Sequence, residues 1–380
     1  MIRGGPSKSV AATPLGDETG GEGKAGGPRP RLLATSIRLS DSLDAVQVKL
    51  GKLAMHLLQP VDRLEIQILI DNLTDSLSTA PANVTLEWPA LMRAGMRLLS
   101  GRCQCCANHG LAVVARGFCD ATSRTILFDA GPVEFAVEYN GTRLGIDFGT
   151  IDAVVLSHGH WDHAGGLPMV FELITKANGG RAIPCYLHPD MFRQRALPLP
   201  GGGLLPIREI PSPGELAARG AAPIVTKEPQ ILLDDMFLIS GEIPRITDYE
   251  KGFPGHKRRS EDGRSWEDDP LIMDERFLAM HVRDKGIVVL TACSHAGVIN
   301  VLKHAQSNFP AIPLYAIAGG FHLAGGNEKI IAESVRDIGK FGLTLIAPGH
   351  CTGWRAVNAL ANAFGDRTVA PLAVGKIFVI

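Results

Sequence analysis

Three histidines and one aspartate fall within six residues, in the segment His158-Gly159-His160-Trp161-Asp162-His163. Alternate side chains of an extended segment point the same way, so we expect the imidazoles of His158 and His160 on one side. Asp162 and His163 must then face elsewhere, which suits a second metal ion better than a fourth ligand to the first. Imidazole and carboxylate ligands at an open site are typical of catalytic zinc or a similar divalent ion. The segment therefore predicts a divalent metal site, with Zn²⁺ as the expected cofactor and one or two ions bound.

The elements around this segment must hold its side chains in place. It directly follows 151–156, a continuous apolar run that is typical of a strand buried on both faces. A loop at the carboxyl end of such a strand can direct several side chains at one point. Patterning predicts further strands at 66–70, 109–116, 124–128, 184–187, 236–240, 277–282, 286–291, 313–318 and 344–347, and helices at 298–306, 328–341 and 356–364. Hairpin-linked strands mixed with single helices fit an α+β fold in which two sheets pack between helical layers.

Composition divides the chain into three parts. Residues 1–30 are rich in Gly, Pro, Ser and Thr, which predicts a disordered leader, and no apolar stretch there indicates a signal peptide. Residues 31–63 predict an N-terminal helical extension, because apolar residues recur at helical spacing between 36 and 58. This helix either covers an edge of the core or contributes to an oligomer interface. Residues 64–380 form the main domain, in which 247–269 carry many charges without periodicity and predict a mobile loop, either a solvated insertion or a lid.

The overall composition narrows the classes of partner. The chain has 380 residues, of which 45% are hydrophobic and 20% charged, as in soluble globular proteins. A net charge of −1 argues against a general attraction to nucleic acid or to an anionic membrane. No apolar run reaches the roughly 18 residues of a membrane span, and seven unevenly spaced cysteines fit reduced thiols in a cytoplasmic protein. We therefore expect a small-molecule substrate, with a homo-oligomer left open and neither a membrane nor nucleic acid as partner.

The metal segment also resembles a known signature. Residues 157–163 are similar to the His-x-His-x-Asp-His signature of the metallo-β-lactamase superfamily, and 165–167 and 127–131 extend the similarity. Six further segments, in order along the chain, resemble the dihydropterin-ribofuranosylaminobenzene-phosphate synthase-like branch: 69–72, 108–111, 240–245, 293–297, 319–323 and 349–353. The resemblance covers residues 64–380. It implies a four-layer αββα sandwich, one metal bound by His158 and His160, and another bound by Asp162 and His163.

The sequence departs from the superfamily pattern at two places. The segment that usually supplies a third histidine to the first metal, 240–244, has none, and 291–295 lacks the usual bridging aspartate. His295 is therefore the expected further metal ligand, and His350, in a glycine-rich turn, is expected to complete the second site. His322 lies in a similar turn and is interpreted as a proton donor or substrate contact in preference to a ligand. Glycine beside each of these histidines permits close approach of the backbone.

Other polar residues have less specific interpretations. His188 follows a predicted strand, and we favour a residue that starts a helix over a metal ligand. His256, in the charged segment 247–269, could contact substrate. Cys103, Cys105 and Cys106 do not have the paired spacing of a zinc knuckle. Histidines 56, 281 and 304 lie within regular elements and are interpreted as structural, and Cys293 and Cys351 as inert thiols lining the pocket.

These residues imply metal-assisted attack by hydroxide on a small molecule. Asp162 would bind the metal and orient the attacking water, and His322 would protonate the leaving group. Glu242 and Arg245 are expected to anchor an anionic substrate, since the guanidinium group matches carboxylate or phosphate, with a structural ion pair as the alternative for Arg245. The leading hypothesis is a metal-dependent hydrolase, or a pterin-linked synthase.

Three alternatives stay open. A protein of the same fold could bind metal and a small molecule without catalysis, a reading that the absent bridging aspartate supports. A phosphodiesterase or nuclease-like activity is less favoured, because no basic stripe or aromatic platform is present in the sequence. Lactonase and β-lactamase activities are not distinguished by any single residue, since one fold serves many reactions.

Overall fold

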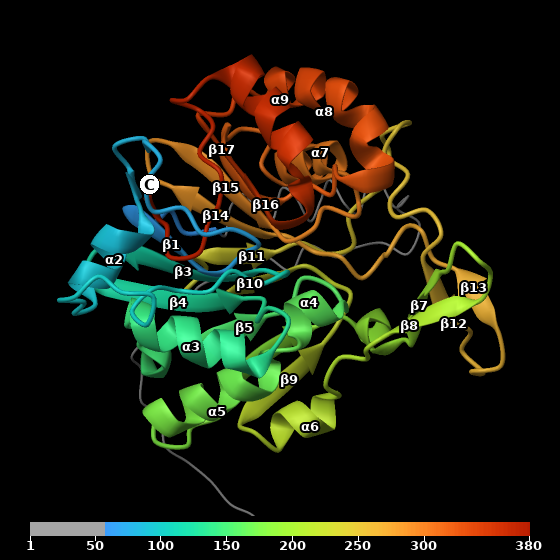
Figure 1. Ribbon diagram of the computed structural model, residues 1–380, viewed down its shortest axis with the longest axis horizontal. Helices are drawn as coiled ribbons and strands as arrows, with labels where there is room; N and C mark the ends of the chain where they lie inside the picture. Colours follow the sequence, from blue (N-terminus) through green and yellow to red (C-terminus); the bar gives the residue numbers. More distant parts are fainter. Residues whose placement is uncertain (1–57) are drawn as a thin grey trace, which may run out of the picture. The chain divides into compact units, whose positions relative to one another are not determined.

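The computed structural model describes residues 58–380 (Figure 1). The leader predicted for 1–30, His56, and nearly all of the extension predicted for 31–63 lie outside the described residues.

Most described strands belong to two large sheets. The eight-stranded sheet has the order β2-β18-β1-β3-β4-β5-β6-β9, with β1 (Arg63–Ile70), β2 (Val84–Thr85), β3 (Ala112–Cys119), β4 (Thr122–Phe128), β5 (Ala153–Val155), β6 (Ile183–Leu187), β9 (Ala221–Val225) and β18 (Ile377–Val379). The six-stranded sheet has the order β10-β11-β14-β15-β16-β17, with β10 (Gln230–Leu232), β11 (Phe237–Ile239), β14 (Leu278–Val282), β15 (Gly286–Thr291), β16 (Leu314–Gly320) and β17 (Leu345–Gly349).

Helices cover the outer face of each large sheet (Figure 1). The first sheet carries α3 (Glu134–Leu144), α5 (Leu167–Ala177) and α6 (Pro213–Ala217), and the second carries α7 (Val298–Asn308), α8 (Ile331–Ile338) and α9 (Trp354–Phe364). Two further helices are α2 (Glu87–Arg93) and α4 (Trp161–Ala164). Between the sheets, Ile66 and Phe128 of the first share a buried core with Met280 and Leu290 of the second. The predicted four-layer αββα sandwich is confirmed.

The apolar patterns explain how these layers form. Every residue of β15 is buried, as expected for a strand with packed layers on both faces. In α5, the buried residues Leu167, Val170, Phe171 and Ile174 recur at helical spacing and form one apolar stripe. The helix predicted at 328–341 is composite, because 3₁₀ turns at Gly325–Ile330 and Gly339–Phe341 flank α8.

The sheet topology brings several loops to one edge. Strands β4, β5 and β6 are parallel neighbours, as are β15, β16 and β17. In parallel strands the carboxyl ends meet at the same edge, where α/β folds place their sites. The segments that follow β5, β15, β16 and β17 contain all the histidines expected at the metal site.

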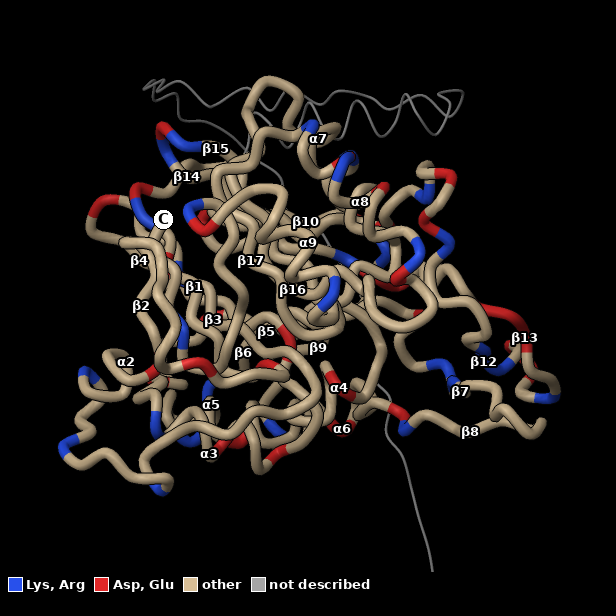
Figure 2. The backbone as a smooth tube through the Cα atoms, turned by 45° about the horizontal axis from the view of Figure 1, so that its top comes forward, with Lys and Arg blue, Asp and Glu red and all other residues tan. Residues whose placement is uncertain are grey.

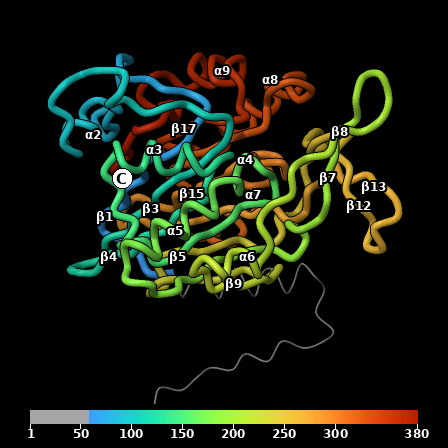
Figure 3. Tube along the Cα trace, turned by 60° about the horizontal axis from the view of Figure 1, so that its bottom comes forward, coloured from blue at the N-terminus to red at the C-terminus, as the bar shows by residue number. Residues whose placement is uncertain are grey.

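The segment 247–269 is not the unstructured loop that its composition predicts. It contains β12 (Lys257–Arg259) and β13 (Trp266–Asp268), which join β7 (Arg195–Pro198) and β8 (Leu204–Ile207) in a sheet of order β13-β12-β7-β8. This small sheet lies to one side of the sandwich (Figures 1 and 3). Opposite charges face each other on β12 and β13, visible as blue and red segments in Figure 2, with Lys257 Nζ 2.7 Å from the Asp268 carboxylate. Cross-strand ion pairs leave no apolar alternation, so the lack of regular structure predicted for 257–259 and 266–268 was wrong, while the role as an insertion or a lid stays a prediction.

Within residues 58–380, no helix has the length and apolar character needed to cross a membrane.

Candidate metal centre

The predicted metal segment begins where β5 ends. His158 and His160 lie in an extended loop, and Asp162 and His163 lie in the first turn of α4, for which His160 is the N-cap. The loop approaches a neighbouring backbone closely: a Cβ atom at Gly159 would lie 2.3 Å from the carbonyl oxygen of Met191. Only glycine allows this approach without a backbone shift.

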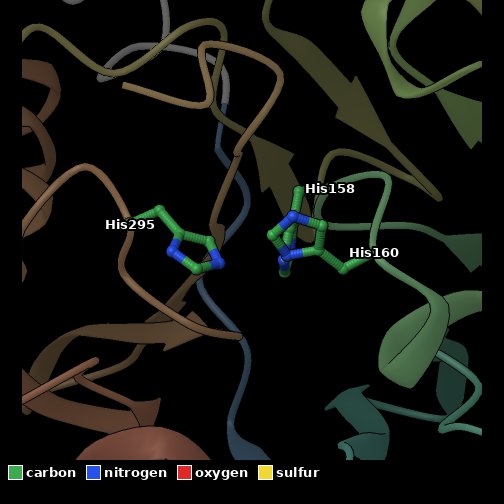
Figure 4. Close-up of side chains that lie close together, drawn as sticks. All are labelled: His158, His160 and His295. Atoms are coloured by element: carbon green, nitrogen blue, oxygen red, sulfur yellow. The ribbon is translucent and has the colours of Figure 1, made fainter. Parts of the chain in front are cut away.

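His158, His160 and His295 form a buried group (Figure 4). Nε2 of His158 lies 2.9 Å from Nδ1 of His160, and Figure 4 shows the ring of His295 facing this pair from the segment after β15. Both ring nitrogens of His295 are buried and have no hydrogen-bond partner among the described residues. Buried polar atoms are nearly always partnered, and a metal ion is a partner that three converging imidazoles fit.

A buried aspartate fixes the orientation of His158 and His163. Asp129, after β4, accepts a hydrogen bond from Ser157 Oγ at 2.8 Å and contacts Nδ1 of His163 at 2.8 Å. Since the proton of Ser157 Oγ goes to Asp129, the same oxygen accepts from Nδ1 of His158, 2.9 Å away. The Nε2 atoms of His158 and His163 are therefore free to face the candidate metal site. In metal sites generally, a hydrogen bond to one ring nitrogen of a histidine orients the other nitrogen toward the ion.

Asp162, His163 and His350 meet beside the first group. Oδ2 of Asp162 lies 3.7 Å from Nε2 of His163 and 3.4 Å from Nε2 of His350. Asn72 Oδ1 contacts Nδ1 of His350 at 3.0 Å, and Nε2 of the same ring has no hydrogen-bond partner in the part of the chain that the structure describes. Cys293 adds its sulfur 3.2 Å from Nε2 of His163. The structure thus brings all six predicted metal-binding residues together: His158, His160, Asp162, His163, His295 and His350.

Burial and neighbouring charges divide these groups by protonation. Burial, with the surrounding histidines, lowers the pKa of His158, His160 and His295 well below the ordinary value, which favours the neutral form that binds metal. Burial alone would raise the pKa of Asp162, but His163 and His350 lower it. Burial opposes protonation of His163, yet the carboxylates of Asp162 and Asp129 raise its pKa to about 9. A metal ion bound by His163 would take the place of this proton.

Three consecutive buried charged residues, Asp274, Glu275 and Arg276, hold both ligand loops. Asp274 accepts from the backbone N–H of Gly159 at 2.8 Å, and Glu275 accepts from the N–H groups of His295 and Ala296 at 2.8 and 2.7 Å. Arg276 donates to the carbonyls of Leu156 and Tyr186, 3.1 Å away in each case. Sequence reasoning missed this segment, because a run of charges ordinarily indicates an exposed surface.

His322 and His109 flank the candidate ligands. The ring of His322 lies 4.3 Å from that of His295, and its buried Nδ1 has no hydrogen-bond partner among residues 58–380. His109 is 60% exposed, with Nε2 3.5 Å from the Asp162 carboxylate and Nδ1 accepting from Asn72 at 3.1 Å. We had not predicted His109 as a site residue, although it follows Asn108 in one of the segments that carry the family resemblance.

A pocket of about 300 Å³ opens over these groups. Its lining combines four of the six candidate metal-binding residues and His322 with four apolar side chains and contains no lysine or arginine: His109, His160, Trp161, Asp162, Leu197, Ile207, Phe253, Cys293, His295, His322, His350 and Cys351. Leu197 and Ile207 come from β7 and β8, so the small sheet contributes one wall.

The structure does not bring Glu242 and Arg245 to this pocket. The guanidinium of Arg245 donates to the backbone carbonyls of Leu271 and Ile272 at 2.6 and 2.8 Å, which occupies the donors that a substrate would need. Arg245 has a structural role through these two carbonyls. It forms no ion pair with a described residue, so the alternative of a structural ion pair was wrong. Glu242 lies 3.3 Å from both His188 and Lys227. His188 begins a 3₁₀ turn and accepts from the N–H of Asp190, as predicted.

Comparisons with known proteins agree with this geometry. The sequence model of the metallo-beta-lactamase superfamily matches residues 112–256. The chain is 29% identical over 273 residues to 7,8-dihydropterin-6-methyl-4-(beta-D-ribofuranosyl)-aminobenzene-5'-phosphate synthase of Methanocaldococcus jannaschii, covering 71% of this chain and 90% of that protein. It is 31% identical over 256 residues to the uncharacterized protein MJ0448 of the same organism, covering 67% and 88%. The crystal structure of Tm1679, a metal-dependent hydrolase of the beta-lactamase superfamily, shares the fold with a TM-score of 0.60 and 21% identity, covering 82% of this chain and 98% of that one.

Proposed function

The chain belongs to the metallo-beta-lactamase superfamily, and on that premise we propose that it is a metal-dependent hydrolase that acts on a small molecule. The observation that carries the proposal is the clustering of five histidines and Asp162 in overlapping groups beside the pocket, with both ring nitrogens of His295 and Nε2 of His350 buried and lacking a hydrogen-bond partner among the described residues. His158, His160 and His295 would hold one divalent ion, and Asp162, His163 and His350 a second. A divalent ion held there would supply an activated water and polarise the bond under attack.

The residues of the chain have separate tasks in this proposal. Asp162, whose pKa is lowered because His163 and His350 outweigh its burial, stays ionised and accepts a hydrogen bond from the attacking water. His322 lies on the pocket wall beside His295 and would donate a proton to the leaving group. Burial opposes protonation of His322, but Cys351 raises its pKa, which favours the proton-donating form.

The pocket lining supports a substrate with an apolar portion. Trp161, Leu197, Ile207 and Phe253 would contact the carbon skeleton, as in small-molecule sites where a few polar groups are set among apolar walls. The absence of lysine and arginine from this lining disfavours a phosphodiester or nucleic-acid substrate. Likeness to the M. jannaschii synthase keeps pterin-linked synthesis as a second candidate.

The experiment combines elemental analysis with a substrate panel of esters, lactones, β-lactams and phosphodiesters. We expect the purified protein to contain a divalent metal and to hydrolyse at least one class. In H160A, we expect less bound metal and no turnover, with the circular dichroism spectrum unchanged. Unchanged metal content in H160A would contradict the ligand assignment. Tight binding of a small molecule without turnover of any class would instead favour a non-catalytic binding protein.

A further inference from the structure

His256 connects the small sheet to the metal centre. It lies immediately before β12 and is fully buried, although the charged segment around it predicts an exposed loop. Its ring contacts that of His160, with the two Nε2 atoms 3.1 Å apart.

The other nitrogen of His256 shows which atom carries its proton. Nδ1 lies 3.0 Å from the backbone carbonyl oxygen of Asp269. Because a carbonyl only accepts, Nδ1 is the donor, and Nε2 of the neutral ring is an acceptor. The N–H of Asp269 in turn donates to the carbonyl of His256 at 2.9 Å. This pair continues the β12–β13 ladder next to Lys257 and Asp268, so the hairpin holds the ring in place.

The same reasoning applies to His160 from its other side. Nε2 of His158 carries no proton, because its Nδ1 donates to Ser157, and it lies 2.9 Å from Nδ1 of His160. If the proton of His160 is on Nε2, that proton points at the acceptor Nε2 of His256. Nδ1 of His160 and Nε2 of His158 then both direct lone pairs at the group formed with His295.

We propose that His256 is a positioning residue of the metal centre: it accepts the Nε2–H of His160 and so fixes the tautomer in which Nδ1 of His160 binds the metal. The relay would run from the carbonyl of Asp269 through His256 to Nε2 of His160, whose Nδ1 would hold the ion. Such partners typically contribute 10–100-fold to metal affinity. This inference rests on the proposed metal-dependent function. It gives the small sheet a second task besides forming the apolar wall.

The test compares two substitutions with a matched control. H256Q keeps a hydrogen-bond acceptor at this position, whereas H256L removes it. H281Q changes a partly buried histidine on β14, outside the pocket lining. Zn²⁺ affinity is measured by chelator competition on the full-length protein, stoichiometry by elemental analysis at saturating metal, and ligand geometry from the absorption spectrum of the Co²⁺-loaded protein.

We expect H256L to bind the full complement of Zn²⁺ with affinity lower by about 10–100-fold, and H256Q and H281Q to bind close to the parental affinity. The Co²⁺ spectrum should keep the parental ligand set in every variant. An unchanged affinity in H256L, or equal losses in H256L and H256Q, would overturn the proposal.

Loss of one metal equivalent in H256Q would also overturn it, because His256 would then be a direct ligand. The metal stoichiometry of H256Q therefore tests the proposal even if H256L does not fold. A parental protein without metal would instead refute the proposed function itself, so the two failures are distinguishable.

Discussion

Each histidine of the pocket has two ring nitrogens, and its hydrogen-bond partner decides which of them faces the metal site. Asp129 sets this choice for His163 directly and for His158 through Ser157, and Asn72 sets it for His350. None of these partners lies beside its histidine in sequence, except Ser157. The histidines themselves were predictable from their clustering, whereas the residues that orient them depend on contacts between separate strands.

At the residue scale, we predict that D129N weakens Zn²⁺ binding by about 10–100-fold. Oδ1 of Asp129 accepts from the N–H of Ser157, and Oδ2 contacts Ser157 Oγ and His163 Nδ1, so the NH₂ group of Asn must face at least one of these donors, which then loses its acceptor. Asn tolerates the positive φ of 61° at this position, which limits backbone strain. Chelator competition measures the effect.

D120N is the matched control, because Asp120 also has a positive φ, of 51°, and lies on an exposed turn. Equal affinities in D129N and D120N would show that Asp129 does not orient the ligands.

At the scale of elements, the loop between β5 and α4 owes its path to Gly159. A Cβ atom there would meet backbone atoms of Met191 at 2.3 and 2.6 Å, and backbone cannot rotate away as a side chain can. We therefore predict that G159A lowers the free energy of unfolding by about 1–3 kcal/mol. Urea denaturation measures this change. G214A, in α6, has open space around the added methyl group and should be neutral or slightly stabilising. Similar values for both variants would contradict the close packing of this loop.

We predict that the free energy of unfolding depends on pH because of Glu250, which lies at the amino end of α7. Burial raises the pKa of Glu250 to about 7, although its carboxylate accepts from the N–H groups of Ile299 and Asn300. The folded protein then holds this proton more tightly than the unfolded chain does. The stabilisation is fully present below pH about 4.5 and is lost as the pH rises through about 7, with an upper limit of about 3 kcal/mol.

E250Q removes this titration, so the free energy of unfolding of the parent, relative to E250Q, should fall between pH about 4.5 and 7. Burial also raises the pKa of Asp71, to about 6, but that effect is common to both proteins and cancels in the difference. A difference that is flat or rises with pH would contradict the prediction. Urea denaturation across this range measures it.

At the scale of the whole molecule, sequence patterns predicted the layers better than the connections between them. Continuous apolar runs such as that of β15 indicate strands buried on both faces. The sandwich, and the sheet edge at which the metal-binding histidines lie, were therefore predictable. The small sheet was not, because β7 and β12 pair across about 60 residues, and β12 and β13 carry charges in place of apolar alternation. Opposite charges at 257–259 and 266–268 were the available signal for that hairpin. No sequence signal indicated that Arg276 is buried, since its burial depends on carbonyls of β6 and of the loop after β5.

The central claim is that the pocket holds a divalent metal that the reaction requires. Elemental analysis of the purified full-length protein, before and after dialysis against a chelator and again after Zn²⁺ is restored, tests it most directly. We predict one or two equivalents of divalent metal per chain, loss of hydrolysis when the metal is removed, and recovery when it returns. A protein that contains no stoichiometric metal after Zn²⁺ addition, or that hydrolyses its substrate equally well without it, would contradict the account.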